Sequence, residues 1–344
     1  MTYPKSRNTP NPTVDYSDPL VRECRGLIVN KNSPYNVICK GFDRFDDVTT
    51  LSQDILRHPS TQVTNIIDGT YVKLYYDTSK GPEKSKWCLA TNRCIDAKKA
   101  RWSSFKTFFD YFQEASNSEN SILDYALLDT KHTYLFVVCH PESRIVRCYT
   151  TPMIYHVGTY DTSSAGCPEI DEDINIPKPP VVDTTKYESL SQLVEYTNTL
   201  DWQDPGFVVK WTDDAGTPHR SKIRNSKYES VNALRGNNPN VALHYLNLRS
   251  DTENPQPFME FTKYFPEYGM IEDSINMLAR YLHQLYMSYY VNKTIQVVPD
   301  RISWKILSQL HTSYIRSRVP TTLDVVQNIV RSLPNEELAK LLRL

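Results

Sequence analysis

The residues of this chain that could do chemistry are mainly cations placed to bind a phosphate. Lys222 and Arg224 alternate with Ile223 in a strand-like run, so the pattern puts both cations on one face of the strand. Such a pair can hold a phosphate group, and it can equally be a solvated face. The pair Asp68-Gly69 is a second candidate, which we interpret either as part of a site or as a turn that needs these residue types.

The chain lacks the glycine-rich loops with which many proteins cradle phosphates. It has 10 glycines against 22 prolines and 23 tyrosines, so there are few places where backbone can lie against a phosphate. Neither G-x-x-x-x-G-K-[ST] nor G-x-G-x-x-G occurs. Nucleotide sites of these two kinds are therefore excluded.

The charge balance excludes a global field that draws the protein to nucleic acid or to a membrane. The 344 residues include 39 basic and 40 acidic side chains, for a formal net charge of −1. Any such binding must use a local patch, such as the loop that carries Lys80, Lys84 and Lys86. No apolar run approaches the roughly 20 residues of a membrane span, and no signal-peptide segment begins the chain. We expect a soluble, intracellular protein.

The cysteines predict reduced thiols rather than a disulfide framework. They are seven in number and form no C-x-x-C pair. Cys139-His140 is the one adjacent pair of potential metal ligands, and no second pair stands at zinc spacing. We therefore expect a buried strand cysteine and no metal site.

Short strands separated by turn signals are predicted from about residue 19 to 240. We expect a hairpin of strands 69–76 and 87–91, and a strand over 206–211. The apolar run 133–139 is expected to pair with 144–149.

Helices and one long loop complete this part of the chain. A helix over 103–115 would place Phe105, Phe108, Phe109 and Phe112 on one core-facing side, and a second helix fits 189–198. The acidic, proline-bearing stretch 163–183 is interpreted as an exposed loop.

Beyond about residue 241 the pattern becomes helical. The predicted helices cover 273–291, 301–316, 322–333 and 335–344. The fold class is therefore α+β: an N-terminal extension (1–18), a β-rich domain (19–240) and an α-helical domain (241–344).

Five segments, in this order and spacing, resemble the motifs of the ATP-dependent RNA ligase family of the phage T4 type. They are ECRGLIV at 23–29, IIDGT at 66–70, FVVCHPESRIV at 136–146, DPGFVV at 204–209 and KIRNSKY at 222–228. The last four resemble K-x-D-G-[ST], F-E-x-x-x-P-x-N-R-I-V, E-G-[YF]-V and K-I-K-x-x-x-Y. Any single match is weak, but five in order indicate the fold.

The resemblance implies a nucleotidyltransferase fold, with antiparallel sheets forming an ATP cleft and a helical C-terminal domain. It also implies a chemistry in which a lysine attacks the α-phosphate of ATP and forms a lysyl-AMP. The AMP then passes to an RNA 5′-phosphate, and a 3′-hydroxyl displaces it. A divalent metal and basic side chains neutralise the phosphates.

Three positions depart from the family pattern, and each carries an apolar residue. Ile66 stands at the place of the nucleophilic lysine, and an alkyl chain has no lone pair with which to attack phosphorus. Val137 stands in place of the glutamate of the nucleotide pocket, and Pro205 in place of a glutamate linked to metal and charge handling. We expect these three to lie in one cleft, and we assign no catalytic residue.

Other positions of the motifs match, and they are the candidates for binding nucleotide or phosphate. Arg224 keeps the charge of the second lysine of the last motif, while Arg25 has an ion pair with Glu23 or Asp68 as its alternative role. The candidates are Arg25, Asp68, Gly69, Lys222 and Arg224.

Three functions are compatible with these residues. We favour a catalytically inactive, ligase-derived protein that is a structural or interaction subunit of a larger assembly such as a viral particle, with protein partners, weak RNA binding and no cofactor. The second is a non-catalytic module that binds nucleotides or RNA ends. The third is an active ligase that uses ATP and Mg²⁺, with the amine of Lys73 or Lys210 displaced to within about 3–3.5 Å of the α-phosphate. The expected location is the cytoplasm, or the virion if the source is viral, and no membrane partner is expected.

Overall fold

The protein divides into two compact units, 1–232 and 233–344, which are described separately. The structure is a computed structural model that describes residues 18–31, 36–79, 81–102 and 105–343. The predicted N-terminal extension therefore lies outside the described residues except for Asp18, and so does Lys80 of the lysine-bearing loop.

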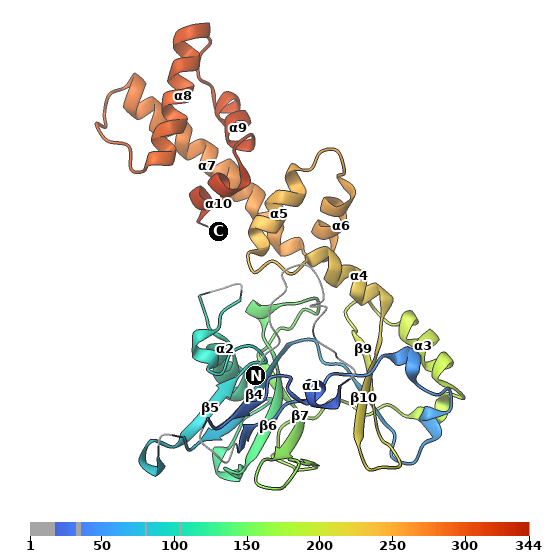
Figure 1. Ribbon diagram of the computed structural model, residues 1–344. Coiled ribbons are helices and arrows are strands. Elements are labelled where there is room, and N and C mark those ends of the chain that lie inside the picture. The colour runs from blue at the N-terminus through green and yellow to red at the C-terminus, as the bar shows by residue number, and fades with distance from the viewer. Residues whose placement is uncertain (1–17, 32–35, 80, 103–104, 344) are drawn as a thin grey trace. The chain divides into compact units, whose positions relative to one another are not determined.

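The first unit is built on three antiparallel sheets (Figure 1). The largest has the strand order β5-β4-β6-β7-β8, the second has β10-β9-β3, and the smallest pairs β1 with β2. The strands are β1 Ile28–Val29, β2 Val37–Cys39, β3 Gln62–Asn65, β4 Thr70–Asp77, β5 Lys86–Ala90, β6 His132–Cys139, β7 Met153–Asp161, β8 Glu169–Ile170, β9 Gly206–Thr212 and β10 Pro218–Arg224.

Two helices cover the main sheets. The helices of this part of the chain are α1 Pro19–Glu23, α2 Phe108–Ser116, α3 Leu190–Thr199 and α4 Ser226–Arg235. The capping box of Thr107 and Asp110 begins α2, which buries Phe112 in the core of the largest sheet. Ser189 caps α3, whose Leu193 is buried with the apolar residues of β3, β9 and β10. The predicted β4–β5 hairpin, the helix near 189–198 and the strand near 206–211 are confirmed.

The predicted pairing of 133–139 with 144–149 is wrong. Strand β6 pairs with β4 on one side and with β7 on the other, and residues 144–149 form no strand. Their backbone donors have a different acceptor: the amides of Val146 and Arg147 donate to the carboxylate of Asp68. A strand ladder cannot use donors that are already bound elsewhere.

Two further predictions need correction. The helix expected over 103–115 begins only at Phe108, and the side chain of Phe105 is 94% exposed rather than in the core stripe. The stretch 163–183 is not simply an exposed loop, because it contains β8 and buries Ile174 and Ile176 in the core of the largest sheet.

The second unit is helical, as predicted. Its helices after α4 are α5 Val241–Ser250, α6 Gln256–Tyr264, α7 Met270–Tyr286, α8 Arg301–Ser317, α9 Leu323–Arg331 and α10 Asn335–Leu342, and a π-helical turn, Met287–Val291, extends α7. The core faces of these helices bury Ile275, Leu282, Leu307 and Val330. The fold class is α+β.

No helix among the described residues combines the length and the apolar character needed to span a bilayer.

Gly69 tests the close approach of β4 to β6. A Cβ at this position would lie 2.5 Å from the carbonyl oxygen of Val138 and 2.8 Å from Cγ1 of Val137. We expect Gly69→Ala to lower the free energy of unfolding by about 1–3 kcal/mol, because backbone cannot move aside cheaply. Urea unfolding measures this, with Gly269→Ala as the control, since a Cβ at Gly269 meets nothing within 4 Å. Equal stability of the two variants would contradict the described contact.

Candidate functional site

A cavity of about 570 Å³ lies between the two main sheets of the first unit, and we call it the Lys222 cavity. The strand register builds one wall, because residues that face each other across neighbouring strands share a side. Gln62, Lys210 and Arg220 form one row of this wall, and Thr64, Val208 and Lys222 form the next. Strands β4, β6, β7 and β8 add to the lining, as do connecting segments. The lining residues in those segments are Arg25, Phe42, Phe45, Ile66, Ile67, Gly69, Asn92, Asp171, Lys178, Pro179 and Val181.

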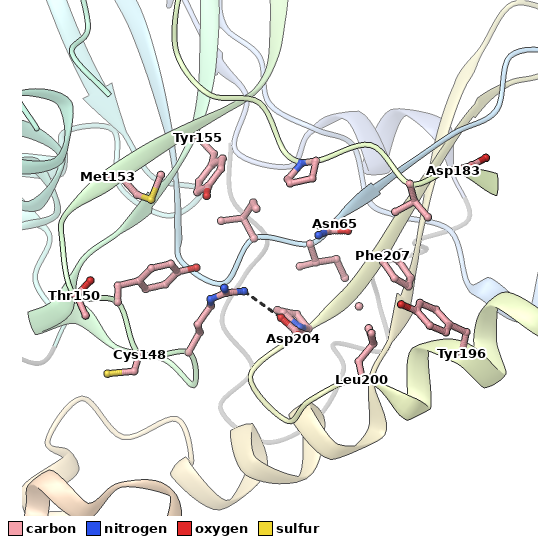
Figure 2. A pocket seen from close by; sticks show the side chains of 18 of the residues that line it. Asn65, Cys148, Thr150, Met153, Tyr155, Asp183, Tyr196, Leu200, Asp204 and Phe207 are labelled. Carbon is pink, nitrogen blue, oxygen red and sulfur yellow. Dashed lines mark hydrogen bonds and ion pairs between the residues drawn. The ribbon is translucent and has the colours of Figure 1, made fainter. Parts of the chain in front are cut away.

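The three altered motif positions were expected in one cleft, but among the described residues no one cavity is lined by all three, because Val137 and Pro205 belong to different linings. Ile66 and Val137 line the Lys222 cavity. Pro205 lines a second cavity of about 610 Å³, which we call the Tyr196 cavity and which contains the residues labelled in Figure 2. Ile66 and Ile67 line both cavities. The amide of Ile66 donates to the carbonyl of Gly206 at 2.8 Å, which holds this segment beside the residue that follows Pro205.

At one end of the Lys222 cavity, a single carboxylate, that of Glu169, pairs with two cations. Its buried carboxylate accepts from Nζ of Lys210 at 2.9 Å and from the guanidinium of Arg220. Burial alone raises the pKa of Glu169, but Arg220 and Lys210 outweigh it, so the pKa is lowered overall. The Arg220 guanidinium also lies 4.2 Å from the ring centroid of Phe42. These cations are therefore already paired.

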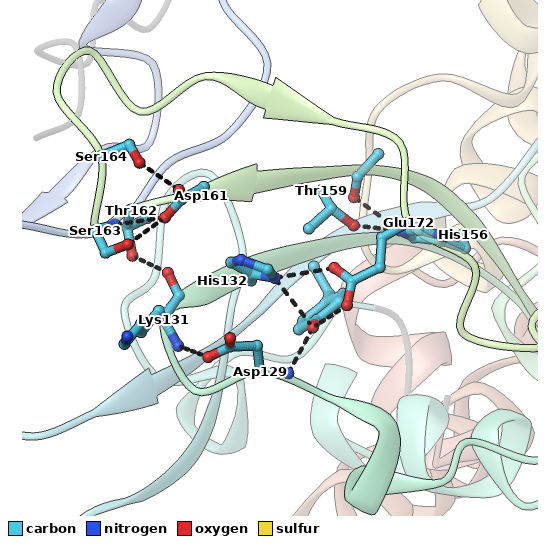
Figure 3. A network of polar contacts seen from close by, with 12 residues as sticks. Asp129, Lys131, His132, His156, Thr159, Asp161, Thr162, Ser163, Ser164 and Glu172 are labelled. Carbon is cyan, nitrogen blue, oxygen red and sulfur yellow. Dashed lines mark hydrogen bonds and ion pairs between the residues drawn. The ribbon is translucent and has the colours of Figure 1, made fainter.

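A polar network fixes the segment that carries Glu169 (Figure 3). Glu172 is bound by Nδ1 of His132 at 2.9 Å and by the hydroxyl of Tyr134 at 3.0 Å. On the other side of β8, Asp161 accepts from the hydroxyls of Ser163 and Ser164 at 2.6 and 2.5 Å. Because hydrogen bonds hold the chain on both sides of β8, Glu169 has a fixed position opposite β9 and β10.

The other end of the Lys222 cavity carries positive charge without a matching carboxylate. Among the described residues, neither Lys222 nor Arg25 has an ion-pair partner, and the expected pairing of Arg25 with Glu23 or Asp68 is not formed. Nζ of Lys222 lies 4.8 Å from the ring centroid of Phe45. Burial, with smaller contributions from Arg224 and Arg25, lowers the pKa of Lys222 to about 8. Two neighbouring unpaired cations in a cavity favour binding of an anion.

Asp68 does not face a ligand, because its carboxylate holds the fold together. The residue is 4% exposed. One oxygen accepts from the amides of Val146 at 3.0 Å and Arg147 at 2.6 Å, and the other accepts from the hydroxyl of Tyr228 at 2.8 Å. Its neighbour Gly69 lines the Lys222 cavity and permits the close approach to β6.

Arg224 and Lys73 also lie outside the lining of the Lys222 cavity. Arg224 is half exposed and paired with Glu229. Lys73 is fully buried in β4, where its amine donates to the carbonyl of Gly26, and burial lowers its pKa. Of the two substitute nucleophiles in the third hypothesis, Lys73 does not line the cavity, and the amine of Lys210 is bound to Glu169.

The cavity does not fit a divalent cation. Its acidic side chains are Glu169, already paired, and Asp171, which accepts from Nζ of Lys178 at 2.6 Å. Elsewhere, ligand atoms of Glu114, His140 and Glu142 lie within 4.8 Å of one another. In that group the ammonium of Lys106 already binds both glutamates. We therefore derive no metal-dependent step.

The cysteines are free, and the pair singled out in the sequence is structural. All seven are free thiols, and Cys139 is buried in β6. His140 is buried too, and its Nε2 lies 2.8 Å from a carboxylate oxygen of Glu114.

Sequence reasoning missed Glu169, Arg220 and His156 in the lining of the Lys222 cavity. Arg220 had a signal, because it stands two residues before Lys222 in the same alternation. Glu169 had no such signal, because no local pattern distinguishes it from the other acidic residues of the stretch 163–183. His156 is buried in β7, and burial lowers its pKa to about 4, so it is neutral near pH 7.

Comparison with known proteins gives the family. Residues 23–234 match the family model described as RNA ligase, and because the match spans more than half of the sequence, the chain belongs to the RNA ligase family.

Relatives of the chain occur in viruses of invertebrates. It is 24% identical to the "Immediate-early protein ICP-46 homolog" of Invertebrate iridescent virus 6, over 92% of this chain and 74% of that protein. It is 22% identical to the "Putative bifunctional polynucleotide kinase/RNA ligase" of Autographa californica nuclear polyhedrosis virus, over 94% of this chain but only 48% of that protein. Among solved structures, an archaeal ATP-dependent RNA ligase aligns with a TM-score of 0.41 and 12% identity, over 73% of this chain and 70% of its own.

The role of Asp68 is tested by Asp68→Asn. An amide offers one acceptor in place of two and turns a donor toward the bound donors, so we expect the free energy of unfolding to fall by about 2–4 kcal/mol in urea titration. Asp183→Asn is the matched control, because Asp183 caps an exposed turn through the amide of Thr185 and asparagine caps equally well. Equal effects of the two changes would contradict the assigned role.

Proposed function

We propose that this member of the RNA ligase family does not form a lysyl-AMP and instead binds the phosphate of a nucleotide or of an RNA 5′-end without a covalent bond. The observation that carries the proposal is the pair Arg25 and Lys222, two cations without an ion-pair partner among the described residues, in a cavity where Ile66 stands at the nucleophile position. The cations attract a phosphate, and the alkyl side chain cannot attack it.

The surroundings of the pair support binding without transfer. Of the lysines considered as substitutes, Lys73 is buried and does not line the cavity, and Lys210 is paired with Glu169. Val137 faces the cavity with an apolar side chain, and the carboxylates of the lining are held by cations. Nucleotidyl transfer needs a nucleophile and charge neutralisation of a leaving pyrophosphate, whereas binding needs only the cations.

The relatives favour RNA as the source of the phosphate. The family is that of RNA ligases, and the name of the baculovirus relative refers to both RNA ligation and polynucleotide phosphorylation. A 5′-phosphorylated RNA end is the chemical group that these two activities share. Because the relatives are viral, we also propose a viral source; the role of an interaction subunit, a virion location and protein partners stay predictions.

Absence of covalent transfer is tested by incubating the chain with α-³²P-labelled ATP and Mg²⁺, followed by a denaturing gel. We expect no labelled protein band, because Ile66 offers no nucleophile. The control is the Lys73→Ala variant under the same conditions. A labelled band in the natural protein that disappears in this variant would overturn the proposal and support the displaced-nucleophile hypothesis.

Phosphate binding is tested by titration calorimetry with AMP and with a 5′-phosphorylated RNA. Lys222→Ala removes a charged donor, and we expect it to weaken binding about 10- to 100-fold. Lys131→Ala is the control, because Lys131 is exposed and lines neither cavity. Equal affinities of the two variants would show that Lys222 does not hold the phosphate.

The affinity should also depend on pH. Binding of a phosphate needs the ammonium form of Lys222, whose pKa in the free protein is about 8. Affinity should therefore be constant near pH 7 and fall above pH 8, by up to about tenfold for each pH unit. Arginine stays charged throughout, so Lys222→Arg should bind equally well from pH 7 to about pH 9.5. A decline of the same size in both proteins would assign the titration to another group.

A further inference from the structure

The Tyr196 cavity is a second candidate site, distinct from the Lys222 cavity. Its lining combines the strand end at Asn65, the segment before β7, the segment before α3, and the start of β9. Tyr155 lies on one side, and Tyr196 and Phe207 lie on the opposite side (Figure 2). Its aromatic side chains are Tyr149, Tyr155, Tyr187, Tyr196 and Phe207.

Helix α3 explains why Tyr196 is available to a ligand. Leu190 and Leu193 anchor the helix in the core, and Tyr196 follows three positions later at 43% exposure. Its ring is nearly parallel to that of Phe207, with centroids 6.2 Å apart and planes at 10°, and it contacts Tyr187 at 5.5 Å. The stack leaves an aromatic ring partly open, and an open ring of this kind can receive another flat ring.

The charges around this cavity are balanced, unlike those at Arg25 and Lys222. Arg147 pairs with Asp204 at 3.1 Å, and Lys186 pairs with Asp183 at 3.7 Å. These four residues are the charged members of the described lining, so its formal charge is zero. A polyanion gains little there, whereas an uncharged, flat group with hydrogen-bonding edges gains both stacking and polar contacts.

We propose that the Tyr196 cavity binds an unpaired nucleobase of single-stranded RNA by stacking on Tyr196. The choice of RNA rests on the proposed function, since aromatic rings also receive other flat groups. The segment Ile66-Ile67 lines both cavities, so a bound strand meets a phosphate site on one side of this segment and a base site on the other. The chain then binds 5′-phosphorylated RNA more tightly than AMP, and a strand without the base loses this advantage.

The probe is a 5′-phosphorylated RNA hexamer with 2-aminopurine placed in turn at each of the first three positions. Stacking quenches 2-aminopurine fluorescence, and anisotropy of a 3′-labelled copy gives the affinity. We expect quenching at one position, and a 5- to 100-fold weaker affinity for Tyr196→Ala or for an RNA that is abasic at that position. Tyr196→Phe keeps the ring and should bind within about twofold of the natural protein.

Tyr125→Ala is the matched control. Tyr125 is 42% exposed and contacts Trp87, as Tyr196 contacts its aromatic neighbours, but it lines neither cavity. Thermal unfolding of each variant shows whether the fold is kept, and Tyr196→Phe covers the case in which the alanine variant does not fold.

The outcomes separate this inference from the proposed function. One outcome is that Lys222→Ala loses AMP binding, while neither Tyr196→Ala nor the abasic site changes the RNA affinity. It overturns the inference and leaves the proposed function intact. A second outcome is quenching that is lost in Tyr196→Ala, together with AMP affinity that is unchanged in Lys222→Ala. It supports the inference and overturns the proposed function. Absence of quenching at all three positions, with a well-folded protein, also overturns the inference and leaves a peptide side chain as the alternative occupant.

Discussion

The buried carboxylate of Asp68 is the interaction on which the candidate sites depend. It joins the segment after β3 to the backbone of Val146 and Arg147 and to Tyr228 in α4. A charged acceptor with three donors is strong when all are satisfied and costly when one is removed. Its position fixes the Ile66-Ile67 segment, because Asp68 follows that segment directly. Both cavities share that segment in their linings.

This constraint gives the Asp68-Gly69 pair a structural role that does not depend on the side chain at position 66. In this chain the Asp68 carboxylate accepts backbone hydrogen bonds, and Gly69 permits the close approach of the backbone of Val138. The hydrogen bond that holds position 66 is made by the backbone amide, so an isoleucine side chain there is compatible with the fold. Membership of the RNA ligase family is therefore compatible with an isoleucine at position 66.

The two cavities differ in the charge of their linings. In the Lys222 cavity, Glu169 pairs with both Lys210 and Arg220, whereas Arg25 and Lys222 have no ion-pair partner among the described residues. In the Tyr196 cavity the cations are paired, and aromatic rings dominate. Under the proposed function, a phosphate and a base meet different surroundings on the two sides of one segment, which suits a strand with a charged backbone and uncharged bases.

The sequence by itself determined the family, the α+β class and those elements whose signals are local. The β4–β5 hairpin, α3 with its Ser189 cap, and the alternation of β10 depend on neighbours within a few residues. Tertiary structure alone decided that 144–149 is no strand, because the acceptor for its amides is Asp68, 78 residues from Val146. It also placed Glu169 opposite Arg220 and separated Pro205 from Val137. These outcomes depend on partners distant in the chain, and no local pattern of residue types records which distant group will satisfy a buried donor or charge.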